Sequence, residues 1–136
     1  MTTVSQKYLM NYCAKMRLRV SFYQSMTFYM FSVPPKLQNP GYSHQTLRVD
    51  QRFSLFCSIV DGDEPITLTW FKDGNLLVES EADGVSISKV EHDSILRFTS
   101  LEALHMGNYS CHASNEAGVA IKYSYIQVKG TFRIVY

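Results

Sequence analysis

The sequence predicts an all-β fold in which two sheets pack face to face as a sandwich. Several stretches alternate apolar and polar residues, which is typical of strands that bury one face; they cover 53–57, 66–70 and 107–115. No stretch indicates a helix longer than a turn. The only tryptophan lies between two cysteines, in the order Cys57, Trp70, Cys111. Sheets stacked about 10 Å apart can enclose such residues between them.

Length and composition favour a single domain with extensions at both ends. The 136 residues suffice for one domain with a core and not for two. The formal net charge is +1, so neither nucleic acid nor an acidic surface is an expected partner. No Asp or Glu precedes Asp50, and five of the six methionines lie near the start. We therefore divide the chain into a basic leader (1–32), a domain (33–129) and a tail (130–136).

The leader has several interpretations. Basic residues followed by an apolar run over 20–33 resemble a secretory signal in outline. Polar residues interrupt this run, however, and no small-x-small cleavage site follows. The run is also too short and too polar to span a bilayer. A transit peptide does not suit the domain behind it, so a signal-like segment or a disordered or non-native extension remains. Cys13 lies here as an odd cysteine without an obvious partner.

Two edge segments are expected to open the domain. Two prolines exclude a helix or a central strand at 33–37. A turn at 39–41 separates this segment from a short edge strand at 44–49. The strand at 52–59 then places four apolar residues on one face: Phe53, Leu55, Cys57 and Ile59.

An acidic loop at 61–65 follows this strand. Its clustered carboxylates could hold calcium, but an EF-hand needs a longer spaced pattern that ends in a glutamate. We therefore expect a solvated loop, and we expect the chain to use no metal or cofactor.

The middle of the domain should supply the next inward-facing residues. Trp70 points inward on a strand that begins at Ile66, and Phe71 points outward. A short strand at 76–78 and an acidic loop at 79–84 come next. Val85 and Ile87 belong to the following strand. On the strand after it Leu96 and Phe98 should face the core, and Leu101 closes the bend.

The last two strands flank a hairpin loop at 115–118. Tyr109, Cys111 and Ala113 should face the core, and the Tyr109 hydroxyl should reach back to the backbone of the turn at 104–107. On the final strand Ile126 and Val128 point inward. Ile121 and Tyr123 have the opposite phase, which predicts a β-bulge between the two pairs.

These motifs resemble the I-set of immunoglobulin domains over about residues 33–129. The matching pieces are Leu55-Phe-Cys57, Trp70-x-Lys72-Asp-Gly74, Leu96-x-Phe98 and Gly107-x-Tyr109-x-Cys111-x-Ala113-x-Asn115-x-x-Gly118. Pro34-Pro-Lys-Leu37 followed by Gly62-Asp63-Glu-Pro65-Ile-x-Leu68-x-Trp70 is similar to Down syndrome cell adhesion molecules (Dscam), particularly the arthropod ones. The resemblance implies a Cys57–Cys111 disulfide that closes about 54 residues. In a cytosolic muscle module the two cysteines would instead remain thiols.

One position departs from the general I-set pattern. Much of the I-set carries aspartate where this chain has His105. Aspartate anchors the turn through a charge or capping contact, which we expect His105 to replace only in part. A softer corner should result. In having a histidine at this position, the chain resembles Dscam-type domains.

Nothing in the sequence favours an enzyme. The four histidines fall on different elements, and none is expected to pair with a serine or cysteine at catalytic spacing. Gly-rich phosphate loops, CxxC and HExxH are absent from the sequence, so we expect no small-molecule substrate. A modification site does occur, because Asn108-Tyr109-Ser110 is an N-glycosylation sequon. Alternation with buried Tyr109 turns Asn108 outward, although such triplets also arise by chance.

Outward aromatic side chains form the candidate binding site. Interfaces are enriched in aromatic residues, and the outward positions of three neighbouring strands carry Phe71, His112, Tyr123 and Tyr125. The opposite sheet presents Phe56 and Ile95, flanked by Arg97 and Thr99. Scattered surface aromatics are also common without any function, or a neighbouring domain covers them. We favour the first of the two faces.

The resemblance to Dscam implies a module for homophilic cell–cell adhesion, axon guidance and dendrite self-avoidance. Its partner would be a protein, either a different one or the same protein on another cell. The module would be extracellular or at the plasma membrane, as part of a larger anchored protein. Affinity would come from many domains in series. Two alternatives remain, a structural module of a matrix or muscle filament protein and the ligand-binding ectodomain of a receptor kinase or phosphatase.

Overall fold

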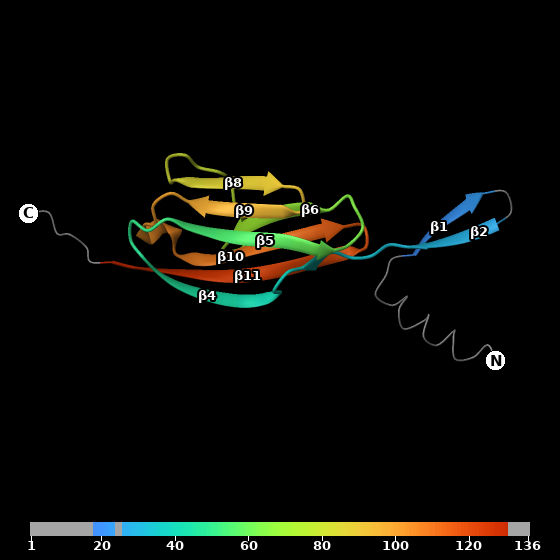
Figure 1. The fold of residues 1–136 in the computed structure, drawn as a ribbon, viewed down its shortest axis with the longest axis horizontal. Helices are drawn as coiled ribbons and strands as arrows, with labels where there is room; N and C mark the ends of the chain where they lie inside the picture. Colours follow the sequence, from blue (N-terminus) through green and yellow to red (C-terminus); the bar gives the residue numbers. More distant parts are fainter. Residues whose placement is uncertain (1–17, 24–25, 131–136) are drawn as a thin grey trace, which may run out of the picture.

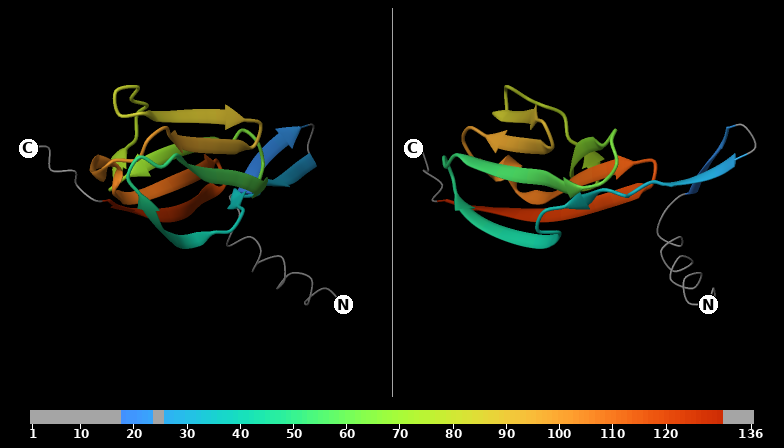
Figure 2. Two further views of the ribbon diagram at one scale, coloured as in Figure 1. Left: turned by 60° about the vertical axis from the view of Figure 1, so that its left-hand side comes forward. Right: turned by 45° about the vertical axis from the view of Figure 1, so that its right-hand side comes forward.

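The chain folds into a two-sheet sandwich with a separate hairpin at one end. A computed structural model describes residues 18–23 and 26–130, with side chains from Phe31 onward (Figure 1). The hairpin extends from one end of the sandwich, and the last strand ends at the other (Figures 1 and 2). The predicted all-β sandwich is confirmed.

Five strands form the larger sheet, in the order β4-β11-β10-β6-β7. Their bounds are β4 (Gly41–Arg48), β6 (Thr67–Lys72), β7 (Asn75–Leu76), β10 (Gly107–Asn115) and β11 (Gly118–Lys129). β4 and β11 run parallel, whereas the other neighbours are antiparallel. The long strands β10 and β11 therefore form the centre of this sheet, between β4 and β6.

Four strands form the smaller sheet, in the order β3-β5-β9-β8. Their bounds are β3 (Lys36–Leu37), β5 (Phe53–Asp61), β8 (Val85–Val90) and β9 (Asp93–Phe98), and all neighbours are antiparallel. The opening segment of the domain thus divides between the sheets, since β3 pairs with β5 and β4 with β11. The crossing lies at Asn39-Pro40-Gly41, where Asn39 (φ 48°) and Gly41 (φ 119°) adopt positive φ.

The hairpin ahead of the sandwich consists of β1 (Leu18–Tyr23) and β2 (Met26–Phe31). The two strands pair antiparallel from Leu18 opposite Phe31 to Tyr23 opposite Met26. From the sequence this part of the leader is expected to be signal-like or disordered, so the two strands are not predicted. Cys13 and the tail after Gly130 lie outside the described residues.

A disulfide and a side-chain hydrogen bond are among the contacts that join the sheets through the core. A disulfide links Cys57 on β5 to Cys111 on β10, with an S–S distance of 1.99 Å and a Cα–Cα distance of 6.3 Å. Beside it, Trp70 Nε1 donates a 2.9 Å hydrogen bond to Ser94 Oγ on β9. Ser94 and Leu96 are fully buried. The tryptophan therefore fills the core without leaving its ring N–H unpaired.

The bulge predicted in the last strand is absent. β11 pairs with β10 in unbroken register from Gly118 opposite Asn115 to Ile126 opposite Gly107. Small or polar residues, Ala120, Lys122 and Ser124, occupy the inward positions of this stretch instead of Ile121 and Tyr123. Buried Ser124 accepts a 2.9 Å hydrogen bond from Ser43, and Lys122 Nζ donates to the carbonyl of Phe56 at 3.3 Å. Because these polar groups find partners on other strands, β4 and β5, a change of phase is unnecessary.

His105 anchors the corner before β10 more fully than predicted. It ends the 3₁₀ turn η1 (Ala103–His105) and is 1% exposed. Its Nδ1 accepts the Glu102 N–H at 2.8 Å, and its Nε2 lies 2.8 Å from the carbonyl oxygen of Asp83. The ring also packs edge-on against Phe98, with centroids 5.3 Å apart. Since a carbonyl only accepts, Nε2 carries the proton, and an aspartate could not make this second bond.

Tyr109 completes the same corner. Its hydroxyl donates a 2.8 Å hydrogen bond to the carbonyl of His105, and the side chain is 1% exposed. The predicted contact between this tyrosine and the preceding turn is therefore present. Burial and, secondarily, the nearby Asp73 carboxylate raise the pKa of Tyr109.

Tyr109→Phe should destabilise the domain by about 1–2 kcal/mol at neutral pH, because it leaves the His105 carbonyl without its partner. The folded-state pKa of Tyr109 lies above the unfolded value of 10.0, so the stability linked to its proton is complete below pH 10 and declines above it. Urea unfolding at pH 8 and pH 11 should show wild type losing more stability than Tyr109→Phe. Equal losses would contradict this assignment.

Candidate functional site

The register of the larger sheet gathers the outward aromatic side chains into adjacent rows. Ser110 on β10 pairs with Phe71 on β6 and with Tyr123 on β11. Tyr123 in turn pairs with Tyr42 on β4, and Phe71 with Leu76 on β7. This row crosses all five strands. We call the outward rings of this sheet the aromatic face; its members are Tyr42, His44, Phe71, His112, Tyr123 and Tyr125.

Two ring contacts hold the aromatic face in a fixed arrangement. The rings of Phe71 and His112 lie 4.4 Å apart between centroids, and those of His44 and Tyr125 lie 5.3 Å apart. Such pairs restrict side-chain rotation before a partner arrives. Tyr42 and Tyr123 are 67% and 41% exposed. The face therefore combines rigid and accessible rings, both of which favour docking.

The aromatic face has few formal charges. One flanking row contains His44, Tyr125 and Asn108, and the other contains Ile121, His112 and Thr69. None of the residues named in these rows, nor those of the central one, is Asp, Glu, Lys or Arg. One carboxylate lies at the margin, because Asp73 Oδ1 accepts the Asn108 N–H at the end of the first flanking row. Partial burial lowers the pKa of His112, which favours its neutral ring. Depletion of charge at the centre is typical of protein interfaces.

All four binding residues predicted from the sequence, Phe71, His112, Tyr123 and Tyr125, lie on this face. Tyr42 and His44 also lie on this face and are not predicted from the sequence. Their alternation along an edge strand was visible in the sequence, but the pairing of that strand with β11 was not. Parallel pairing over Gly41–Arg48 brings both rings beside the tyrosines of β11.

One expectation about catalytic pairs is wrong. Ser110 Oγ lies 3.0 Å from His112 Nε2, although no serine–histidine pair was predicted. The two residues are two positions apart on one strand, so their side chains point to the same side. Ser110 is only 6% exposed, which keeps a substrate atom from its hydroxyl. The contact supports the packing of the aromatic face.

The smaller sheet offers a weaker alternative. Phe56 is 57% exposed and pairs with Ile95, which is half-buried. Beside them the guanidinium of Arg97 donates a 3.1 Å hydrogen bond to Ser88. This face has one exposed ring with a charge next to it, whereas the larger sheet has six rings without Lys, Arg, Asp or Glu between them.

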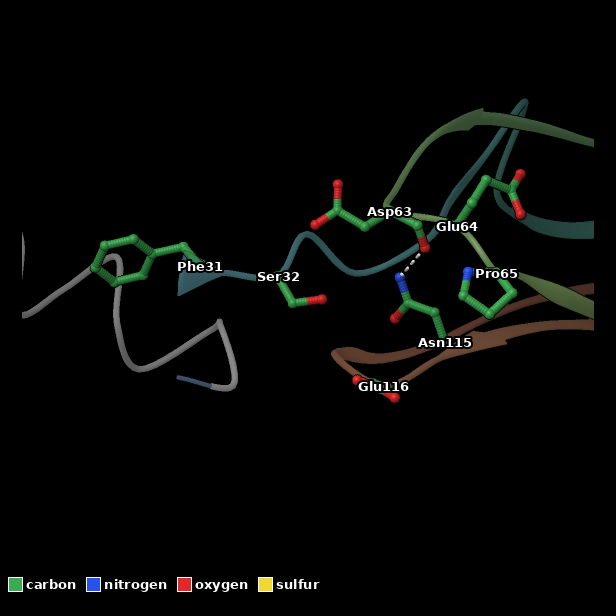
Figure 3. A pocket seen from close by; sticks show the side chains of 7 residues that line it. All are labelled: Phe31, Ser32, Asp63, Glu64, Pro65, Asn115 and Glu116. Carbon is green, nitrogen blue, oxygen red and sulfur yellow. Dashed lines mark hydrogen bonds between the residues drawn. The ribbon is translucent and has the colours of Figure 1, made fainter. Parts of the chain in front are cut away.

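The acidic loop caps backbone groups at the hairpin end of the sandwich. Asp61, Asp63 and Glu64 accept backbone N–H bonds of 2.7–2.9 Å from Gly62, Val33 and Ile66. Asn115 joins the same region by donating to the carbonyl of Asp63 (Figure 3). It also donates to the carbonyl of Val33. Among the described residues, no group of three or more His, Cys, Asp or Glu is placed to hold a metal ion. The hydrogen bonds from the three carboxylates to backbone N–H groups fix the loop.

The hollow drawn in Figure 3 lies between this loop and the hairpin. Its lining consists of Phe31, Ser32, Asp63, Glu64, Pro65, Asn115 and Glu116.

No helix within the described part of the chain is long and apolar enough to cross a membrane.

Comparison with known proteins agrees with the fold and the motifs. The family model for the immunoglobulin domain matches residues 34–115. Over 97 residues the chain is 38% identical to the cell adhesion molecule DSCAM of Rattus norvegicus. This match covers 71% of the chain and 5% of that protein. The cell adhesion molecule Dscam2 of Drosophila melanogaster is 36% identical over 98 residues, with the same coverage. The chain thus spans only about 5% of the length of these relatives, and the resemblance predicted from the motifs is confirmed.

Solved structures show the same architecture. The Dscam1 Ig7 domain, isoform 5, superposes with a TM-score of 0.65 at 27% identity, covering 72% of this chain and 99% of that one. An immunoglobulin domain from the complex of titin M10 with obscurin-like 1 gives a TM-score of 0.64 at 24% identity, covering 73% and 97%. The latter likeness concerns the fold alone.

Proposed function

Because the chain belongs to the immunoglobulin domain family, we propose that it is a recognition module of an adhesion protein and docks another protein on its aromatic face. The observation that carries this proposal is the row from Tyr42 to Leu76, which crosses the whole sheet without a charged residue. Burying such a row on a partner costs little desolvation of charge. It also removes several partly exposed rings from water.

The proposed partner is a second copy of the same protein on another cell. A face without Asp, Glu, Lys or Arg between its rings, and with the Asp73 carboxylate only at its margin, is little repelled by its own copy, which suits a two-fold symmetric contact. The similarity to cell adhesion molecules of the DSCAM group supports this choice. In this role the module would serve axon guidance and dendrite self-avoidance, with affinity built from domains in series.

The proposed location is outside the cell, within a larger membrane-anchored protein. Disulfides persist in the secretory pathway and are rare in the cytosol, and Cys57 and Cys111 are joined here. The same bond counts against the cytosolic filament module, in which both cysteines would stay reduced. Residues 33–129 form the proposed recognition domain.

Alanine substitutions on the two sheets test the docking face. Beads coated with the full chain display many copies, which makes weak self-association measurable as aggregation. Phe71→Ala and Tyr125→Ala should each weaken the contact by about 2 kcal/mol, or roughly 30-fold in the dissociation constant, if they are central interface residues. Phe56→Ala removes an exposed ring from the other sheet and serves as the matched control.

The variants must first show a wild-type circular dichroism spectrum and cooperative unfolding, because Phe71 is half-buried. Loss of aggregation in Phe71→Ala and Tyr125→Ala, but not in Phe56→Ala, supports the proposal. The opposite pattern would move the contact to the smaller sheet. Absence of aggregation in wild type would argue against a homophilic role.

A further inference from the structure

The glycosylation sequon lies on the aromatic face. Asn108 pairs directly with Tyr125 on β11, which pairs with His44 on β4. The Asn108 side chain is exposed and points to the same side of the sheet as Ser110 and His112. Of the five asparagines in the sequence, Asn108 alone starts an Asn-x-Ser/Thr triplet. The single sequon of the chain therefore occupies the flank of the proposed docking surface.

The folded sheet protects the sequon from the transfer reaction. The Asn108 N–H donates to Asp73 Oδ1, and its carbonyl accepts the Asp73 N–H, each at 2.8 Å. Ser110 is 6% exposed, and the following Cys111 is held in the disulfide. An enzyme that reads the Asn-x-Ser backbone and hydroxyl would have to act before β10 joins its neighbours. Glycosylation and closure of the strand therefore compete, so both forms of the chain should be secreted.

The chemistry at Asn108 needs a lipid-pyrophosphate-linked oligosaccharide as donor. The side-chain Nδ2 forms a bond to the anomeric carbon of the first sugar and loses one proton. The bond between that carbon and the pyrophosphate oxygen breaks, and the lipid pyrophosphate leaves with the electron pair. No oxidation or reduction occurs.

An oligosaccharide attached at this position would lie close to the rings. Side chains of directly paired residues have Cβ atoms about 4.5–5.5 Å apart, so the first sugar lies beside Tyr125. The row of Tyr123 and Phe71 is only two residues further along β10. A branched glycan is bulky and solubilising, and a second protein could not reach these rings through it.

We propose that an N-linked glycan on Asn108 covers the aromatic face and blocks docking there, so that glycosylation divides the chain into an adhesive and a non-adhesive form. This inference rests on the proposed docking function. The covering of the rings, however, is measurable without any partner.

Hydroxyl-radical footprinting tests the covering directly. Full-length chain secreted from cells that glycosylate is compared with Asn108→Gln. Cleavage after Lys122 and Lys129 releases a peptide with Tyr123 and Tyr125 but without the sugar, and Phe56 lies on a separate peptide. We expect several-fold lower oxidation of the two tyrosines in the glycosylated form and equal oxidation of Phe56. Equal oxidation of the tyrosines, or a secreted chain with no glycan at Asn108, would overturn the proposal.

Bead aggregation tests the block. Asn108→Gln and the wild-type chain made in cells with N-glycosylation inhibited lose the sugar by different routes, so an effect that both share belongs to the sugar. We expect both unglycosylated forms to aggregate at least several-fold more than the glycosylated chain. Protected tyrosines with equal aggregation of all forms would overturn the block while leaving adhesion intact. If no form aggregates, the proposed homophilic function fails, and the footprint still decides whether the glycan covers the face.

Discussion

Replacing Cys57 and Cys111 together by alanine is expected to lower the free energy of unfolding by about 4 kcal/mol. The bond joins residues 54 positions apart, so its loss restores much conformational freedom to the unfolded chain. Small domains have only about 5–15 kcal/mol of stability, and the melting temperature should fall by roughly 20 °C. Thermal and urea unfolding of the purified chain would measure both quantities.

Cys13→Ala is the matched control for this experiment. It removes a cysteine that the sequence places outside the domain, and it should leave the unfolding free energy within about 0.5 kcal/mol of wild type. A loss below about 1 kcal/mol in Cys57→Ala/Cys111→Ala would show that the disulfide adds little to the packed sandwich. It would also weaken the argument for an oxidising compartment.

His105→Ala is expected to destabilise the domain by about 3 kcal/mol. The change deletes the acceptor for the Glu102 N–H and the donor to the Asp83 carbonyl, and it removes the ring packed on Phe98. Unpaired buried polar groups cost about 1–3 kcal/mol each, and the missing ring leaves a cavity in addition. Urea unfolding at pH 8 would give the difference.

Aspartate, which much of the I-set carries at the position of His105, provides the comparison variant. His105→Asp can still accept the Glu102 N–H but cannot donate to Asp83, so its loss should be smaller than that of His105→Ala. Both variants should free the loop at 79–84, seen as faster hydrogen exchange of the Gly84 amide, which bonds Glu81. An unchanged exchange rate would contradict a role for His105 in holding that loop.

The core residues were predictable from the sequence because the alternation of apolar and polar residues along a strand indicates which of its faces is buried. Trp70, Tyr109 and Leu96 stand at every second position of alternating stretches, and all three are buried. The same alternation turned Asn108 outward. This information is local, since the side-chain period of a strand does not depend on which strand lies beside it.

Contacts between distant segments were not predictable. Ser94 as partner of Trp70, Asp83 as partner of His105, and Tyr42 beside Tyr123 all join residues from elements that are separate along the chain. The bulge prediction failed for a related reason, because partners for Ser124 and Lys122 come from other strands. Each of these contacts depends on register, which one strand alone does not specify.

The amino-acid order by itself determined the sandwich, its two half-cystines and the side of each strand that faces the core. The tertiary structure alone decided that six rings from four strands form one continuous surface and that Asn108 lies on its flank. The physical reason is that burial of alternate residues is a property of a single strand. The neighbours on a sheet surface, in contrast, are set by how separate strands align when they exchange backbone hydrogen bonds.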